Sequence, residues 1–242
     1  MSDKIEKIAL VSGANRGIGA AVVAGLAKAG VHVLLGARDL AAGEATAAPL
    51  RAAGGSVTAV QLDVTDPQSV AALAEKLADD YGHIDILVNN AGVGLDYVPG
   101  MSPVEKMEAT LAINVVGGLR LTEAMLPLLE KSAAARIVNV SSELASFGLR
   151  HDPAWEHHDK VMPIYAASKA AVNALTVGYA LALAPKGIKV NAICPGYTAT
   201  AATNFMPDRT VEQAAVVILQ MALLENDGPT GGFYNDQGAL PW

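Results

Sequence analysis

The stretch IALVSGANRGIGAAVVAGLAK, residues 8–28, decides the fold. It begins with four apolar residues, continues through a turn with three glycines, and ends in a segment of helical length from about residue 17 to residue 28. A short apolar run that leads through a glycine turn into a helix is typical of the first unit of a chain in which strands and helices alternate.

The same alternation continues along the chain. Further strands are expected over residues 31–36 and 57–64, from Ile84 in IDILVNN, from Ala135 in ARIVNVSS and from Ile188 in IKVNAICPG. Helices are expected between them, for example over residues 40–53 and 67–80. Because strands separated by helices run parallel, the sequence predicts the α/β class: a doubly wound, Rossmann-type sheet in a single domain of residues 1–242.

The composition limits the function classes. Of the 242 residues, 52% are apolar and 17% are charged, which gives ample material for a core and too little charge for intrinsic disorder. The net charge of -7 disfavours binding of the surface to the phosphate backbone of nucleic acids. With one cysteine, Cys194, neither an internal disulfide nor a cysteine zinc cage can form, and a reducing compartment fits.

A membrane partner is not expected either. The N-terminal MSDKIEK runs into an apolar stretch that soon meets the polar SGANRG, which leaves no apolar core for a signal peptide. No stretch reaches the roughly 18 uninterrupted apolar residues of a membrane span. The chain is therefore expected to be soluble and cytoplasmic.

The turn SGANRGIG, residues 12–19, carries the first sign of chemistry. Gly13, Gly17 and Gly19 follow the pattern G-x-x-x-G-x-G, which differs from the G-x-G-x-x-G of many dinucleotide-binding folds. Backbone without Cβ turns tightly and lets a pyrophosphate approach the free N–H groups at the positive end of a helix. A plain strand-to-helix loop is the alternative, but the flanking strand and helix favour dinucleotide binding.

The end of the second strand indicates which dinucleotide binds. GARD places Arg38 nineteen residues after Gly19, where such folds hold either an acid for a free ribose 2′-hydroxyl or an arginine for a 2′-phosphate. Arg16, inside the glycine turn, can reach the same phosphate, and a guanidinium binds phosphate bidentately. The sequence therefore predicts NADPH. The alternative is NADH, with Asp39 on the ribose hydroxyl and both arginines in solvent.

Six further motifs accompany this turn. They are LDV at residues 62–64, NNAG at 89–92, NVVG at 114–117, VSS at 140–142, YAASK at 165–169 and PGYTAT at 195–200. In this order they resemble the short-chain dehydrogenase/reductase family, in its small single-domain branch, over nearly the whole chain. The resemblance implies strand order 3-2-1-4-5-6-7. GARD, QLDVTD and PTGGFYNDQGALPW are most similar to NADPH-dependent carbonyl reductases.

Tyr165 and Lys169 form the centre of the predicted catalytic site. They are four residues apart on one helix and share a face, so the ammonium can lie near the phenol and lower its pKa. Tyr165 then becomes a usable general acid in reduction and a general base in oxidation. The resemblance adds Ser142, which donates to the substrate oxygen, with Ser141 as the alternative. It also adds Asn114, which holds a water in a proton relay behind Lys169.

The resemblance implies a cofactor-binding set drawn from the ends of several strands. Asp63 and Val64 are expected at the adenine, residues 90–92 at its ribose, and residues 195–200 at the nicotinamide. The full expected set is Gly13, Asn15, Arg16, Gly17, Ile18, Gly19, Arg38, Asp63, Val64, Asn90, Ala91, Gly92, Tyr165, Lys169, Pro195, Gly196, Thr198 and Thr200. No metal ion is expected.

The segment between Ser142 and Tyr165 departs from the family pattern. The two residues lie 23 positions apart, a wider spacing than is usual in the family, so residues 143–163 form an inserted loop near the active-site mouth. The insertion is either a lid that shapes the substrate pocket or a solvated loop. Its adjacent His157 and His158 are not expected to bind a metal, because neighbouring side chains in an extended loop point apart.

Together these residues predict an NADPH-dependent reductase that converts ketones or aldehydes to alcohols. Residues 201–208, which cover the substrate in the family, offer Phe205 and Met206 and imply an apolar pocket. The alternatives are an NAD-linked alcohol dehydrogenase and, from another class, a non-catalytic dinucleotide sensor. The resemblance implies a homo-oligomer, dimer or tetramer, through the helix of Tyr165 and the apolar helix at residues 111–129, with a monomer as the alternative because some carbonyl reductases with a long insertion before the tyrosine are monomers.

Overall fold

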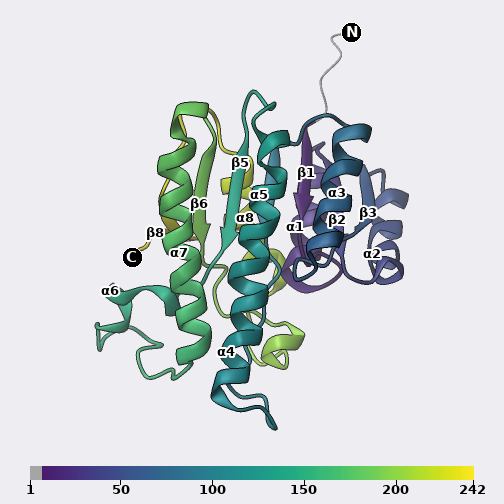
Figure 1. Cartoon of the computed structure of the whole chain (residues 1–242). Coiled ribbons are helices and arrows are strands. Elements are labelled where there is room, and N and C mark those ends of the chain that lie inside the picture. Colours follow the sequence, from purple (N-terminus) through teal and green to yellow (C-terminus); the bar gives the residue numbers. More distant parts are fainter. Residues whose placement is uncertain (1–6) are drawn as a thin grey trace.

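The computed structural model describes residues 7–242, which form one eight-stranded sheet with helices on both faces (Figure 1). The strands are β1 (Ile8–Val11), β2 (His32–Ala37), β3 (Val57–Gln61), β4 (Ile86–Asn89), β5 (Arg136–Val140), β6 (Lys189–Ile193), β7 (Phe233–Asn235) and β8 (Gly238–Ala239). The helices are α1 (Gly17–Lys28), α2 (Leu40–Ala52), α3 (Pro67–Asp80), α4 (Pro103–Leu111), α5 (Gly118–Leu129), α6 (Phe147–Arg150), α7 (Pro163–Leu183) and α8 (Val211–Ala222). The prediction about a signal segment falls on residues 1–6, outside the described residues.

The sheet confirms the predicted α/β class and strand order. The order is β3-β2-β1-β4-β5-β6-β7-β8, and each neighbouring pair is parallel except β7 with β8. The antiparallel β8 is absent from the sequence prediction because two residues are too few to show a strand pattern. The direction of winding changes between β1 and β4, which is the place where open α/β sheets bind ligands.

Two apolar cores enclose the sheet. Along β1 the side chains alternate: Ala9 and Val11 belong to the core shared with α1, α2 and α8, whereas Ile8 and Leu10 belong to the core shared with α3, α5 and α7. Both faces of the strand are therefore buried, which explains why the strands read as continuous apolar runs. A sheet packed on both faces holds the residues at its strand ends in fixed positions.

Two element boundaries differ from the prediction in ways that matter for the site. β3 ends at Gln61 and not at residue 64, so Asp63 and Val64 leave the sheet at its carboxyl edge. The predicted helix at residues 111–129 is not one continuous α-helix. α4 ends at Leu111, a π-helical turn follows over Ala112–Gly117, and α5 begins at Gly118. Such turns are rare and frequently occur at functional sites. This one contains Asn114.

The insertion between β5 and α7 contains regular structure. It includes a 3₁₀ turn, Glu143–Ala145, and the short helix α6, and it lies beside the N-terminal end of α7 at the lower left of Figure 1. The loop is therefore placed at the same end of the molecule as the carboxyl ends of the parallel strands.

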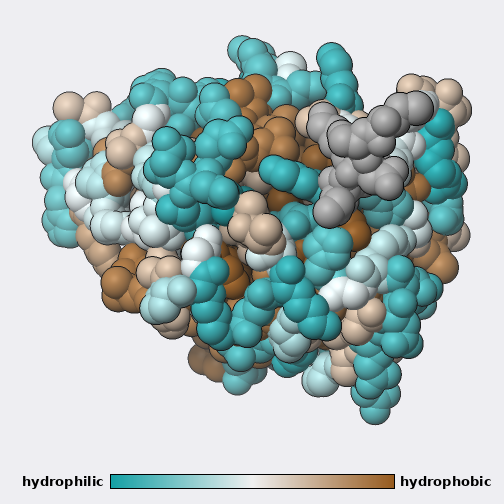
Figure 2. All heavy atoms as spheres, turned by 90° about the horizontal axis from the view of Figure 1, so that it is seen from above, coloured by the Kyte–Doolittle hydropathy of each residue, from teal (hydrophilic) through white to brown (hydrophobic). Residues whose placement is uncertain are grey.

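Two helical stretches are long and apolar enough to cross a membrane when judged by length and composition, Pro103–Leu129 and Pro163–Lys186. In this structure both pack along the sheet, where Leu121, Met125 and Leu183 are buried in the core. Their apolar character therefore has an explanation within the fold. The end of the molecule seen in Figure 2 is covered mainly by hydrophilic side chains, with apolar patches between them.

Candidate active site

The predicted site residues gather at the carboxyl ends of the parallel strands, at the lower edge of the sheet in Figure 1. The glycine turn follows β1, the NNAG loop begins at the end of β4, the two serines follow β5, and the PG turn follows β6. Because parallel strands end at one edge of the sheet, residues far apart in the sequence become neighbours there.

The glycine turn has the backbone that its sequence predicts. Gly13 and Gly17 have positive φ angles of 62° and 57°, a region that strains residues with a Cβ. A Cβ on Gly19 would lie 2.6 Å from Asn90 Nδ2 and 2.6 Å from the Gly13 carbonyl oxygen. The turn therefore closes tightly on the loop after β4.

The N-terminus of α1 has no side-chain cap. Arg16 is the N-cap residue and makes no capping hydrogen bond, and the first turn holds no acidic residue. By contrast, α2, α3, α4 and α8 are each capped by an Asp, Ser or Thr side chain. Uncapped N–H groups at the positive end of a helix, beside a glycine turn, fit the pyrophosphate of a dinucleotide.

Asn90 and Ser12 join the glycine turn to the loop after β4. Asn90 Nδ2 donates to the carbonyl oxygens of Ser12 (2.9 Å) and Gly13 (3.0 Å). Ser12 Oγ accepts hydrogen bonds from the backbone N–H of Asn90 (3.0 Å) and Ala91 (3.1 Å). The amide hydrogens of Asn90 therefore hold the glycine turn, and its predicted place at the adenine ribose stays a prediction.

Arg16 in the glycine turn, and Arg38 and Asp39 after β2, have different environments. Arg16 and Arg38 are exposed, whereas Asp39 Oδ1 caps α2 by accepting from Ala41 N (2.9 Å) and Ala42 N (3.3 Å). The capping role engages Asp39 and leaves the guanidinium groups for an anion.

Arg38 also acts on Asp63, which follows β3. Burial raises the pKa of Asp63, but hydrogen bonds from Thr65 and the positive charge of Arg38 outweigh burial, so this pKa lies below its ordinary value. A guanidinium and an ionised carboxylate therefore stand together where the adenosine end of a dinucleotide is expected.

Tyr165 and Lys169 lie on α7 and come together as predicted. Lys169 is 4% exposed, and its Nζ lies 5.7 Å from the centroid of the Tyr165 ring. Nζ donates a hydrogen bond to the Val140 carbonyl oxygen at 2.7 Å. Burial lowers the pKa of Lys169 to about 8, so the ammonium form still predominates at neutral pH.

The pKa of the Tyr165 phenol shifts in the direction opposite to the prediction. Burial raises it above its ordinary value, the Cys194 side chain and Asp96 raise it further, and a hydrogen bond with Ser142 opposes them. Desolvation is the largest cause of the shift, and Lys169 Nζ, which lies over the ring at 5.7 Å from its centroid, gives its hydrogen bond to Val140. The phenol is therefore held in its protonated form.

The two serines after β5 face different ways. Ser141 is 1% exposed, and its Oγ donates to Asn173 Oδ1 at 2.6 Å, on the side of α7. The Ser142 hydroxyl accepts from Leu144 N at 3.2 Å and acts to lower the pKa of the Tyr165 phenol. Of the two, Ser142 is the serine beside the phenol.

Asn114 lies in the π turn, and its side chain is engaged. Its Nδ2 donates to the Val93 carbonyl oxygen (2.8 Å) and to Ser168 Oγ (2.9 Å), and its Oδ1 accepts from Val93 N (2.8 Å). Both amide hydrogens are used, so this side chain holds the loop after β4 against α7. The predicted role of Asn114, to hold a water behind Lys169, stays a prediction.

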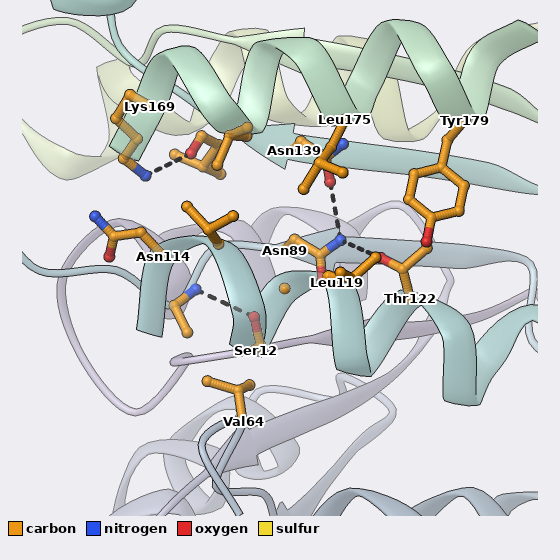
Figure 3. Close-up of a pocket in the computed structure, with 15 residues that line it drawn as sticks. Ser12, Val64, Asn89, Asn114, Leu119, Thr122, Asn139, Lys169, Leu175 and Tyr179 are labelled. Carbon is orange, nitrogen blue, oxygen red and sulfur yellow. Dashed lines mark hydrogen bonds between the residues drawn. The ribbon is translucent and has the colours of Figure 1, made fainter. Parts of the chain in front are cut away.

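A small cavity of about 30 Å³ lies behind Asn114 and Lys169, between the sheet, α5 and α7 (Figure 3). Asn89 lines it, and its Nδ2 donates to Thr122 and Asn139 while its Oδ1 is buried without a hydrogen-bond partner. The lining is mostly apolar with a few polar groups such as Asn89, and a cavity of this size has room for one or two waters.

The turn after β6 is fixed by a residue that sequence reasoning misses. Arg209 Nε donates to the Pro195 carbonyl oxygen at 2.8 Å, and its NH2 group pairs with Asp236 at 2.7 Å. The arginine packs on Gly196, and Thr198 Oγ1 donates to the Gly196 carbonyl oxygen at 2.9 Å. The local sequence around Arg209 has no signal for this contact, because its partner lies 14 positions away in a loop.

Thr200, at the far end of the PGYTAT segment that follows β6, approaches the glycine turn. The Thr200 methyl group lies 3.7 Å from the position that a Cβ on Gly17 would take. The expected nicotinamide-side and pyrophosphate-side residues therefore face each other across one site. Phe205 and Met206, expected over the substrate, are exposed here.

The insertion contacts the turn after β6 through Lys160, and most of residues 151–163 are exposed. Trp155 Nε1 donates to Glu143 Oε2 at 3.3 Å, and Lys160 Nζ lies 3.5 Å from the centroid of the Tyr197 ring. His157 packs its ring against Trp155 at a centroid distance of 5.5 Å. Among residues 7–242, no group of three or more His, Cys, Asp and Glu side chains is arranged to hold a metal ion.

Comparison with known proteins identifies the family of the chain. A family model described as short chain dehydrogenase matches residues 7–210. The chain belongs to the short-chain dehydrogenase family. As a short-chain dehydrogenase, it is an oxidoreductase that uses a nicotinamide dinucleotide and acts on a small molecule.

The similarity extends over nearly the whole short-chain dehydrogenase. It is 33% identical to (-)-isopiperitenone reductase of Mentha piperita, over 98% of each chain. It is 34% identical to the 3-oxoacyl-acyl-carrier-protein reductase FabG of Thermotoga maritima, over 97% of each chain. The NADPH-bound carbonyl reductase from chicken fatty liver superposes with a TM-score of 0.85 at 27% identity, over 98% of this chain and 99% of that one.

Proposed function

We propose that this short-chain dehydrogenase reduces ketones or aldehydes to alcohols with NADPH. The observation that carries the proposal is the meeting of Tyr165, Ser142 and Lys169 at the carboxyl edge of the sheet, near the uncapped N-terminus of α1. When bound, NADPH supplies the hydride, so the chain has to bind and orient both reactants and supply a proton.

Each residue at the site has a distinct proposed role. Tyr165 is the general acid that donates its phenolic proton to the carbonyl oxygen, and the Ser142 hydroxyl orients the same oxygen. Lys169 holds the nicotinamide ribose and stabilises the phenolate left on Tyr165. Asn114 positions the loop after β4, and the cavity beside it has room for the water of a proton relay.

The raised pKa of Tyr165 keeps the phenol protonated, which is the form that the acid in reduction requires. A general acid has to carry its proton at working pH, whereas a general base has to be ionised. Because burial disfavours the phenolate, Tyr165 is ready to donate a proton at neutral pH. The non-catalytic sensor is disfavoured because Asn114, Ser142, Tyr165 and Lys169 all have the residue types that the reaction needs.

NADPH is the proposed cofactor for electrostatic reasons. Arg16 and Arg38 are exposed at the adenosine end, where a guanidinium pairs well with a 2′-phosphate. NADH would need a carboxylate for the ribose hydroxyl, and Asp39 is engaged as the cap of α2. The similar chicken carbonyl reductase is described as NADPH-bound.

The proposed substrate is an apolar ketone or aldehyde. Tyr97, Val161, Phe205 and Met206 are exposed apolar side chains on the loops at this end of the molecule. Exposed apolar groups gathered at one site favour a ligand that buries them. Lys160 is stacked on Tyr197, so its ammonium is not presented alone to an anionic substrate.

A substrate panel tests the proposed function. Purified protein is given NADPH or NADH with aromatic, aliphatic and steroid ketones, a keto acid and a 3-oxoacyl thioester, and dinucleotide absorbance and alcohol formation are both recorded. We expect turnover of the apolar ketones with NADPH. Absence of turnover with every carbonyl would overturn the function, and a preference for the keto acid would overturn the apolar substrate class.

The pH dependence of reduction follows from Lys169. Because its pKa is about 8, Lys169 is charged below that pH and loses its proton above it. We expect kcat/KM for reduction to be level from pH 6 to pH 7 and to fall about tenfold per pH unit above pH 8. A rate profile recorded with NADPH checks this, and a level profile up to pH 10 would contradict it.

We also propose that the protein forms a homo-oligomer. In the most apolar 18-residue stretch of Pro103–Leu129 only 33% is buried, and in that of Pro163–Lys186 only 39%. Val116 and Leu181 are exposed on these helices. Light scattering after size exclusion is expected to give at least twice the mass of one chain. An aspartate at Leu181 should then shift the mass toward one chain, and a single-chain mass for the native protein would refute the proposal.

The proposed location is the cytoplasm. Cys194, the single cysteine of the chain, is a buried free thiol, which suits a reducing compartment.

A further inference from the structure

We propose that Asp96 is a positioning residue for Tyr165, which caps the start of α7 from the loop after β4 and so fixes the backbone that carries the phenol. Asp96 lies outside every motif discussed above, in the loop after β4. The inference rests on the proposed reductase function and extends it to the element that holds the acid in place.

Asp96 caps α7 from a distant part of the chain. Its Oδ1 accepts from Ile164 N at 3.0 Å and its Oδ2 accepts from Tyr165 N at 3.1 Å. The local N-cap residue, Met162, makes no capping hydrogen bond. The carboxylate therefore satisfies two N–H groups at the positive end of the helix, and one of them belongs to Tyr165 itself.

The loop that carries Asp96 also packs on the Tyr165 ring. A Cβ on Gly94 would lie 3.3 Å from Tyr165 Cδ2, so the backbone at Gly94 lies against the ring. One residue after Asp96, Tyr97 donates its hydroxyl to the Val161 carbonyl oxygen at 2.7 Å. The loop thus contacts Tyr165 at Gly94 and at Asp96, and through Tyr97 it contacts the segment that precedes α7.

Contacts on the far side hold this loop in place. Val93 exchanges two hydrogen bonds of 2.8 Å with the Asn114 side chain, and Lys106 Nζ donates to the Asp96 carbonyl oxygen at 2.8 Å. The loop is therefore clamped between α4, the π turn and α7. A loop fixed on both sides can set the position of the phenol.

Four groups face the phenol from the elements around it: Lys169 on α7, Ser142 after β5, Cys194 after β6, and Asp96. The pKa of the Cys194 thiol is raised to about 12 by burial, so this group is neutral at pH 7. Burial is the main cause that disfavours the phenolate, Asp96 is the carboxylate that adds to it, and Lys106 is bonded to the Asp96 backbone rather than to its side chain. Removing the charge should let the phenolate form at lower pH.

The experiment compares two variants of Asp96 with a control. Asp96→Asn keeps an oxygen that can accept from the helix and removes the charge, whereas Asp96→Ala removes both. The matched control is Asp66→Asn, because Asp66 is an exposed residue that caps α3 through Gln68 N at 2.9 Å. For each protein, kcat/KM is measured against pH in both directions, together with hydrogen exchange of the peptide covering the start of α7.

We expect the profile for alcohol oxidation to move to lower pH in Asp96→Asn, with the KM for the dinucleotide unchanged. In Asp96→Ala we expect kcat to fall about ten- to a hundredfold, with faster exchange at the start of α7, and Asp96→Asn should recover most of that loss. The control should match the wild type in every measurement. An Asp96→Asn profile that coincides with the wild-type profile would overturn the role of the charge.

The exchange measurement separates this inference from the proposed function. If the wild type turns over no carbonyl or alcohol, the reductase function fails, and exchange decides the positioning role alone. Faster exchange at Ile164 and Tyr165 in Asp96→Ala, but not in Asp66→Asn, supports that role. Unchanged exchange overturns it, whether or not the protein is a reductase.

Discussion

Replacing Tyr165 by Phe is expected to lower kcat for carbonyl reduction by about a thousandfold, because the substitution removes the proton that general-acid catalysis supplies. The ring remains and keeps its contact with Gly94, so the fold and the dinucleotide affinity should stay close to those of the wild type. The measurement is steady-state NADPH consumption, with dinucleotide binding followed separately by fluorescence.

The control for this variant is Tyr81→Phe. Tyr81 follows α3 and pairs with His32 through its hydroxyl at 3.2 Å, away from the site. Tyr81→Phe removes the same hydroxyl from the same residue type, but at a position away from the site. We therefore expect kcat to stay within about a factor of two of the wild-type value. A Tyr165→Phe enzyme with near-normal turnover would exclude Tyr165 as the acid.

Replacing Arg38 by Ala is expected to lower kcat/KM with NADPH by about ten- to a hundredfold while changing the value with NADH little. A charge-assisted pair between a guanidinium and a phosphate contributes about 1.5–3 kcal/mol, and NADH lacks the 2′-phosphate. The measurement is kcat/KM with both dinucleotides for one ketone. The double variant Arg16→Ala/Arg38→Ala should lose more of the preference than either single variant.

Arg51→Ala supplies the control for charge. Arg51 is also an exposed arginine on the same side of the sheet, at the far end of α2, where it pairs with Glu44 at 2.6 Å. The net charge changes by the same amount as in Arg38→Ala, so a general electrostatic effect would appear in both variants. A wild-type preference for NADH would contradict the assignment, as would equal losses with both dinucleotides in Arg38→Ala.

The parallel sheet and the glycine turn were predictable because they depend on local patterns, whereas the strand order followed from the family resemblance. Short apolar runs separated by helical segments require a parallel sheet, and a glycine turn between β1 and α1 requires positive φ angles that the structure contains at Gly13 and Gly17. The pairing of Tyr165 with Lys169 was also predictable, since residues four apart on a helix share a face.

The features that sequence reasoning missed depend on contacts between distant segments. Asp96 reaches Tyr165 across 69 positions, and no local pattern marks a carboxylate that caps a helix so far away. The π turn at Asn114 interrupts a segment whose spacing fits a continuous helix. The direction of the Tyr165 pKa shift depends on burial, which the four-residue spacing from Lys169 does not reveal.

The most direct test of the central claim is transfer of deuterium from NADPH labelled at C4 of the nicotinamide to an apolar ketone. The account predicts an alcohol with one deuterium on the carbinol carbon, formed at the rate of NADPH consumption by the wild type and about a thousandfold more slowly by Tyr165→Phe. Deuterium at another position of the product, or NADPH consumption without alcohol, would contradict the account.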